Sequence, residues 1–209
     1  MINDSRFGIY NKKWGWYSVY IKAKSNILTR CGMKSKKIVF TAFHQAELLE
    51  VETRPLQEND VLTEMEYTVV SGGTERANIM AMPNAGGNSF PKNLGYCGVG
   101  RVTEIGEKVT SVSVGDRVLV YHGKHMKYSV QSEDKVTKIE DDRIDSLDAA
   151  FVIIASMGLG GVRKLEVELG ESAMVMGLGL LGQFSVQFSN VLPISVEGVC
   201  KHLFSCLKH

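Results

Sequence analysis

Short runs of alternating apolar and polar residues dominate the chain between Lys37 and residue 131. Such alternation turns one face of a segment inward and the other outward, so it predicts β-strands. The expected strands span residues 38–43, 46–51, 61–70, 98–105, 117–121 and 126–131. Turn-forming pairs such as Gly106-Glu107 and Gly115-Asp116 separate several of them. Short strands at these intervals are typical of a small barrel or sandwich.

The pattern changes beyond residue 145. Residues 146–164 are mostly apolar and carry Asp145 and Asp148 near their start, which predicts a helix. After it we expect a buried strand over 172–176, a glycine turn, a helix over 183–189, a strand over 191–196 and the beginning of a helix over 199–208. The fold class is therefore mixed α/β: a β-barrel over residues 33–155, followed by an incomplete doubly wound domain over 156–209.

Residues 1–32 form a basic, aromatic-rich leader without a sustained period. Its interleaved lysines and aromatics could bind single-stranded nucleic acid. No RNA-binding motif accompanies them, so we favour an extension outside the folded unit and no nucleic-acid partner. A mitochondrial presequence is a third, weaker interpretation.

Composition supports an ordinary globular protein, with 44% hydrophobic and 22% charged residues in 209. The net charge of +1 conceals an asymmetry, because nine of the 24 Lys and Arg residues but only Asp4 of the 23 acids lie within residues 1–37. The four cysteines show no paired spacing, which indicates reduced thiols and a cytoplasmic location. The uncharged stretch 172–196 contains glycines and a proline that favour strand, turn and helix over a membrane span, so we expect no membrane partner.

The strongest motif is a G-x-G-x-x-G directly after an apolar strand and before a helix. It consists of Gly177, Leu178, Gly179, Leu180, Leu181 and Gly182. In such a turn the first glycine permits a sharp bend, the second lets the backbone approach a pyrophosphate, and the third allows close helix–strand packing. A purely structural glycine turn is the alternative.

An acid follows at the expected distance. Glu197 lies twenty residues after Gly177, at the end of the second predicted strand, where a dinucleotide-binding unit places a carboxylate on the ribose hydroxyls. An acid there favours NAD over NADP. A solvated residue at a strand end is the alternative for Glu197.

Three further strings resemble a known family: Gly95-Tyr96-Cys97-Gly98-Val99-Gly100, Glu104-Ile105-Gly106 and Val114-Gly115-Asp116-Arg117-Val118. They are similar to the barrel of medium-chain, zinc-type alcohol dehydrogenases and reductases, and the resemblance covers residues 34–209. It implies a GroES-like β-barrel followed by a Rossmann domain, here incomplete. It also implies hydride transfer between NAD or NADP and an alcohol, aldehyde or ketone.

The chain differs from zinc-dependent members of this family at the positions that bind the metal. Gly72 stands where zinc-dependent members have their first cysteine ligand, Tyr96 stands where they have a histidine, and the structural zinc lobe is absent. We therefore expect no zinc. An alternative zinc site could consist of Cys97, His122 and His125. We do not favour it, because the spacing of these residues matches no zinc pattern.

Without zinc, hydrogen-bond donors must polarise the carbonyl oxygen. Thr74 stands where the family keeps a hydroxyl proton relay, and Tyr96 could supply a phenol, so these two are the candidate catalytic residues. Thr74 could instead hold a turn, and Tyr96 could be a core aromatic. Glu75 matches an acid that supports the metal in the family, and without a metal it could pair with Arg76 or Arg101.

We interpret the chain as a zinc-less oxidoreductase of this group that takes a small alcohol or carbonyl substrate. With only the opening strands of a nucleotide domain, it should turn over weakly or not at all, and its unpaired sheet edge should favour homo-oligomers. The main alternative is a non-catalytic interaction module built on the barrel.

Overall fold

The computed structural model describes residues 7–12, 16–21, 32–168, 171–191 and 195–199. The chain divides into two compact units, Met1–Phe151 (unit 1) and Val152–His209 (unit 2), each described here by itself. The boundary expected from the sequence, at residue 155, lies a few residues inside unit 2.

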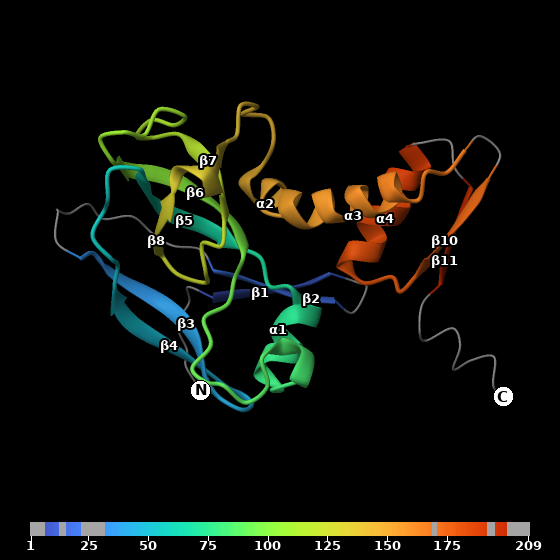
Figure 1. Cartoon of the computed structure of the whole chain (residues 1–209), viewed down its shortest axis with the longest axis horizontal. Helices are drawn as coiled ribbons and strands as arrows, with labels where there is room; N and C mark the ends of the chain where they lie inside the picture. The colour runs from blue at the N-terminus through green and yellow to red at the C-terminus, as the bar shows by residue number, and fades with distance from the viewer. Residues whose placement is uncertain (1–6, 13–15, 22–31, 169–170, 192–194, 200–209) are drawn as a thin grey trace. The chain divides into compact units, whose positions relative to one another are not determined.

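A curled, five-stranded antiparallel sheet forms the centre of unit 1 (Figure 1). Its strands, in spatial order, are β8 (Tyr128–Ser132), β5 (Asp60–Thr68), β6 (Cys97–Ile105), β7 (Arg117–Tyr121) and β9 (Val136–Lys138). A separate hairpin consists of β3 (Lys34–Ala42) and β4 (Gln45–Glu52). Bridges at Lys37–Met126 and Phe40–Lys92 tie β3 to the loops of the sheet. The strands predicted from alternation in this part of the chain are confirmed, and β7 has the predicted bounds.

Apolar residues from these strands and from the loop between β6 and β7 meet in one cluster. Its buried members are Val61, Met65, Val102, Val109, Val112, Val118, Val120 and Val136. Burying a valine side chain contributes about 1.5–3 kcal/mol, so this cluster is a main source of the stability of unit 1. It also fixes the ends of β5, β6 and β7, and these ends carry the candidate site.

Helical segments connect the strands. Helix α1 (Gly72–Ile79) follows β5, and 3-10 turns span Pro83–Ala85 and Glu133–Lys135. Helix α2 (Ser146–Ala149) begins after Asp145, whose Oδ1 accepts a hydrogen bond from the backbone N–H of Leu147 at 2.7 Å.

The single helix predicted over 146–164 is two helices, because α2 ends at Ala149 and α3 (Val152–Lys164) begins three residues later. Between them the N–H of Phe151 donates to the carbonyl of Asp148, three residues back, at 3.1 Å. This tightened turn interrupts the i to i−4 ladder. Along the chain, unit 1 ends and unit 2 begins at this break.

The described part of the leader forms an antiparallel hairpin of β1 (Phe7–Lys12) and β2 (Trp16–Ile21). The sequence pattern did not predict this hairpin. Its registered pairs run from Phe7–Ile21 to Lys12–Trp16.

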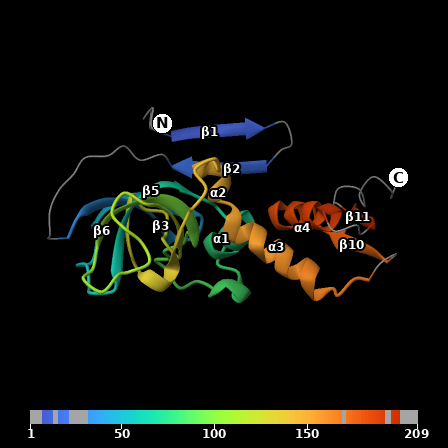
Figure 2. The same cartoon turned by 90° about the horizontal axis from the view of Figure 1, so that it is seen from above.

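Unit 2 is a strand–helix–strand unit preceded by α3. Strand β10 (Ser172–Met176) has the predicted bounds and pairs in parallel with β11 (Ser195–Val199), and α4 (Leu180–Val191) connects them. Figure 2 shows α3 and α4 side by side. A Cβ on Gly158 of α3 would lie 3.1 Å from the Cβ of Phe184, so glycine permits this close approach.

The second strand of this unit exists, but the start predicted for it, at residue 191, is wrong. Helix α4 extends to Val191, and β11 begins only at Ser195. Val191, an apolar β-branched residue at the end of the helix, resembles a strand residue when read locally, and tertiary context decides between the two. The helix predicted over 199–208 lies outside the described residues. None of the helices described is both long and apolar enough to cross a membrane.

Candidate functional site

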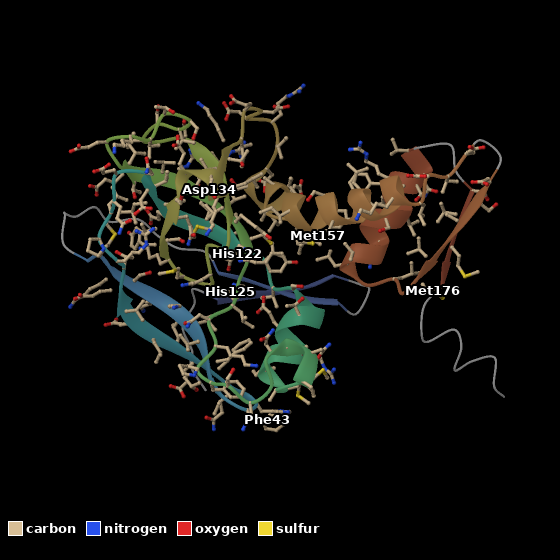
Figure 3. The ribbon with its side chains drawn as sticks, viewed as in Figure 1. Phe43, His122, His125, Asp134, Met157 and Met176 are labelled. Carbon is tan, nitrogen blue, oxygen red and sulfur yellow. The ribbon has the colours of Figure 1, made fainter. Side chains whose placement is uncertain are left out.

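Three segments converge where β5 ends and β6 begins. The first is the turn from Thr68 into α1, the second is the loop that enters β6 at Cys97, and the third is the loop between β7 and β8. Figure 3 shows His122 and His125 of the third segment on the side of the sheet where α1 lies. The two candidate catalytic residues, Thr74 and Tyr96, lie on the first and second segments.

A buried carboxylate joins the first and third segments. Glu75 is 6% exposed and His125 is 3% exposed. Nε2 of His125 lies 2.9 Å from Oε1 and 3.0 Å from Oε2 of Glu75, and Nδ1 lies 2.9 Å from Oγ1 of Thr68. Both ring nitrogens are therefore occupied. The expected pairing of Glu75 with Arg76 or Arg101 is wrong, because Glu75 pairs with His125 and Arg101 pairs with Glu66 at 3.0 Å.

Ser71 connects the two candidate hydroxyls. Its hydroxyl donates to Oγ1 of Thr74 at 3.2 Å, and its backbone N–H donates to Oε1 of Glu75 at 3.1 Å. Its side chain also has a hydrogen-bonding interaction with the phenol of Tyr96. Ser71, Thr74 and Tyr96, the hydroxyl cluster, are thus brought together. Sequence reasoning missed Ser71, although a serine before an acidic first turn is a recognisable helix N-cap signal.

Burial raises the pKa of the Tyr96 phenol, and the interaction with Ser71 acts in the opposite direction. The neighbouring Cys97, Glu75 and Tyr121 raise this pKa further. The phenol therefore stays protonated through neutral pH and remains a hydrogen-bond donor.

A glycine lets the second and third segments touch. Gly95 has a φ of +96°, and a Cβ there would lie 2.6 Å from the backbone nitrogen of His125. His125 donates through that nitrogen to the carbonyl of Leu94 at 3.0 Å, and His122 donates to the carbonyl of Tyr96 at 2.6 Å. These bonds hold the phenol-bearing loop against the β7–β8 loop.

Aromatic rings lie beside the hydroxyl cluster. The rings of Tyr121 and His122 are 4.1 Å apart, and each lies 6.5 Å from the ring of Tyr96. His122 also has a φ of +58°, a left-handed conformation that is uncommon for a non-glycine residue and often found at functional sites.

The residues at this site do not suit zinc. Gly72 and Tyr96 occupy the positions where the resemblance places two ligands, and His125 uses both nitrogens in the contacts above. Burial, reinforced by Glu75, raises the pKa of the Cys97 thiol to about 12, which disfavours the thiolate that a metal needs. Within the described ranges, no three His, Cys, Asp or Glu side chains are grouped as ligands. Cys97, His122 and His125 are not brought together as a metal set.

The glycine turn of unit 2 is tight on one side and open on the other. Gly177 has a φ of +100°, and a Cβ on Gly182 would lie 1.9 Å from the carbonyl oxygen of Gly177. A Cβ on Gly179 would meet nothing within 4 Å, so the space above this residue is open. Leu180 and Leu181 begin α4, whose first N–H groups have no carbonyl one turn earlier. A side chain at 182 could not fit, whereas the backbone at 179 is open on the side where a Cβ would stand.

Glu197 lies in the middle of β11, opposite Met174, and two residues of the strand follow it. The expectation that it ends its strand is wrong, because the strand begins later than predicted. Its side chain lies outside the described residues.

A cavity of about 510 Å³ lies at the other end of the sheet from the hydroxyl cluster. Leu62 and Ile105 line it near the start of β5 and the end of β6, together with Thr53, Leu56, Glu58 and Glu107. Because it is a strand's length from Thr74 and Tyr96, it is not the substrate pocket for those hydroxyls.

Comparison with known proteins decides the family. Residues 57–167 match the alcohol dehydrogenase GroES-like domain, which is just over half of the 209 residues. The chain belongs to this family. Unit 1 is therefore a GroES-like domain, and the family expected from the sequence is confirmed.

Two proteins of similar sequence are dehydrogenases. The D-guloside 3-dehydrogenase of Escherichia coli is 28% identical over 184 residues, which cover 77% of this chain and 52% of that protein. An alcohol dehydrogenase of Geobacillus stearothermophilus is 27% identical over 198 residues, covering 78% and 57%. This chain spans about half the length of these two relatives.

Solved structures share the fold. The CAD protein of Helicobacter pylori, crystallised with NADP(H), superposes with a TM-score of 0.71 at 16% identity, covering 80% of this chain and 59% of that one. At this identity the likeness concerns the fold alone.

Proposed function

We propose that the chain is an oxidoreductase unit that binds NAD or NADP at Gly177–Gly182 and presents Thr74 and Tyr96 to a small alcohol or carbonyl substrate, without catalytic zinc. The opening of a Rossmann domain in unit 2 is part of this proposal. The observation that carries it is the glycine turn, where a Cβ on Gly182 would overlap the Gly177 carbonyl and the space at Gly179 is open. Family membership supports it, because the relatives above are dehydrogenases.

A bound nicotinamide would supply or accept the hydride. The hydroxyl cluster then donates hydrogen bonds to the substrate and holds the two donors in place. Tyr96 and Thr74 donate hydrogen bonds to the substrate oxygen, where negative charge develops during reduction. Ser71, which contacts both, keeps the two donors close to each other. The raised pKa of Tyr96 keeps its proton available at neutral pH.

Glu197 is the acid that we propose to bind the ribose hydroxyls of the nucleotide. Glu197 stands on β11, which pairs in parallel with β10 directly before the glycine turn. Its mid-strand position places it further from the strand end than a ribose-binding carboxylate usually lies. The choice between NAD and NADP therefore rests on experiment.

Thermal unfolding with NADH and with NADPH tests the nucleotide site. A ligand at a hundred times its dissociation constant adds about 2.7 kcal/mol to stability. We expect Gly179→Val to abolish this stabilisation, because its side chain fills the open space, without unfolding unit 2. Gly160→Val on α3, where a Cβ also meets nothing within 4 Å, is the matched control and should keep the response to nucleotide.

If neither nucleotide stabilises the chain at millimolar concentration, the proposal fails and the interaction-module interpretation takes its place. A response that survives Gly179→Val would place the nucleotide elsewhere on the chain.

A further inference from the structure

The buried pair of Glu75 and His125 has no part in the donor role proposed for Thr74 and Tyr96. Both side chains are almost completely shielded from solvent, and together they make four polar contacts of 3.1 Å or less. Burying a carboxylate is costly unless it is paired and hydrogen-bonded. Such a pair at the junction of three segments therefore calls for a structural explanation.

The contacts converge on Ser71. Oε1 of Glu75 accepts from the backbone N–H of Ser71 at 3.1 Å, and the same oxygen lies 2.9 Å from Nε2 of His125. The backbone N–H of His125 also binds the Leu94 carbonyl, two residues before Tyr96. One histidine thus anchors both the turn that carries Ser71 and the loop that carries the phenol.

We infer that Glu75 and His125 are positioning residues that hold the Ser71 hydroxyl between Tyr96 and Thr74. Glu75 fixes the backbone of Ser71, so the serine side chain can reach both partners. His125 fixes Glu75 and the Leu94–Tyr96 loop together. The catalytic use of this arrangement rests on the proposed function, but the arrangement itself does not.

Titration of Tyr96 distinguishes the positioning of Ser71 by Glu75 from a direct effect of the Glu75 charge on the phenol. Ser71 lowers the pKa of the phenol, whereas the negative charge of Glu75 raises it, and the Ser71 effect is the larger. If Glu75 positions Ser71, removing its contacts loses the Ser71 interaction and the pKa of Tyr96 rises. If Glu75 is only a nearby charge, the same change lowers that pKa.

The experiment uses the full chain labelled with 3-fluorotyrosine, with the Tyr96 signal assigned by Tyr96→Phe and followed by ¹⁹F NMR against pH. Fluorine makes the phenol more acidic, which brings the titration below strongly alkaline pH. Ser71→Ala sets the reference and should raise the pKa of Tyr96, because the hydrogen bond that lowers it is lost. Glu75→Leu should raise it in the same direction, and the change should be absent when Ser71→Ala is already present.

Glu75→Gln is the conservative variant. Its amide oxygen can still accept from Ser71 N–H, and its NH₂ group can donate to an imidazole nitrogen of His125. We expect its Tyr96 pKa to stay near that of the native chain or to fall slightly with the lost charge. If the pKa of Tyr96 fell equally in Glu75→Leu and Glu75→Gln, the inference would be overturned. It would also be overturned if the pKa of Tyr96 did not rise in Ser71→Ala.

A second pair of variants covers the case in which Glu75→Leu does not fold. His125→Gln places an amide where Nε2 contacts Glu75, whereas His125→Asn is one methylene shorter and leaves the carboxylate without that donor. A rise in the pKa of Tyr96 only in His125→Asn supports the positioning role, and equal behaviour of the two variants contradicts it. Asp60→Asn, a buried carboxylate at the far end of β5, is the control and should leave Tyr96 unchanged.

The titration needs no nucleotide, so its outcome is independent of the nucleotide test above. A positive titration without nucleotide binding would keep the positioning pair and remove the proposed function. A negative titration together with nucleotide binding would remove the positioning role of the pair and leave the proposed nucleotide site standing.

Discussion

Lys92 offers the sharpest test of how unit 1 is held together. Its side chain is 9% exposed, and Nζ donates to three backbone carbonyls: Gly87 at 2.8 Å, Ala85 at 2.9 Å and Asn78 at 3.2 Å. The ammonium also lies 5.0 Å from the ring centre of Phe90. One side chain therefore closes the loop that follows α1, and Lys92→Met removes all of these polar contacts while keeping the apolar stem.

The expected loss follows from the contacts. A hydrogen bond to a charged group contributes about 1.5–3 kcal/mol. The three carbonyls belong to half-buried residues, so water can replace part of the interaction, and the ammonium is no longer desolvated in the variant. We expect Lys92→Met to lower the free energy of unfolding of unit 1 by about 3 kcal/mol.

Urea unfolding followed by circular dichroism measures the loss, and amide hydrogen exchange over residues 78–87 shows whether the loop itself opens. Lys108→Met is the matched control, because its side chain is 65% exposed and its ammonium pairs with the exposed Glu58. Such a surface pair contributes less than about 1 kcal/mol. If the two variants lost equal stability, the reasoning about the carbonyl cage would be refuted.

Gly95→Ala should destabilise unit 1 by more than about 2 kcal/mol, because its Cβ would lie 2.6 Å from a backbone nitrogen. Gly115→Ala, where φ is +93° and the space is open, should destabilise it by about 1 kcal/mol, and thermal unfolding compares the two variants. Asp60→Asn should destabilise the chain most near neutral pH. The Arg54 hydrogen bonds lower the pKa of Asp60, so its stabilisation exists above its unfolded pKa and disappears as pH falls through the folded one, and the difference measured by urea unfolding should shrink below about pH 4. Cys97, with its pKa raised to about 12 by burial, should react with a disulfide reagent at pH 8 only on unfolding; fast reaction in the native chain would contradict the burial argument.

Local sequence determined much of the β-structure and the glycine turn. Apolar patterns depend only on neighbours in the chain: alternation predicted β7 with its bounds, and a short apolar run before the glycine turn predicted β10 with its bounds. The turn at Gly177–Gly182 was likewise readable, because a positive φ and a close helix–strand contact both demand glycine at fixed spacing. The family strings around β6 and β7 pointed to the GroES-like domain that the comparison confirmed.

The tertiary structure alone decided the partners of the buried polar groups. Glu75 and His125 are fifty residues apart, and their pairing depends on how β5, β6 and β7 place their ends, which no local pattern encodes. The same holds for Ser71, whose N-cap signal could be read but whose contact with Tyr96 could not. The helix break at Phe151 and the late start of β11 could not be predicted either, because local propensity is weak compared with tertiary context.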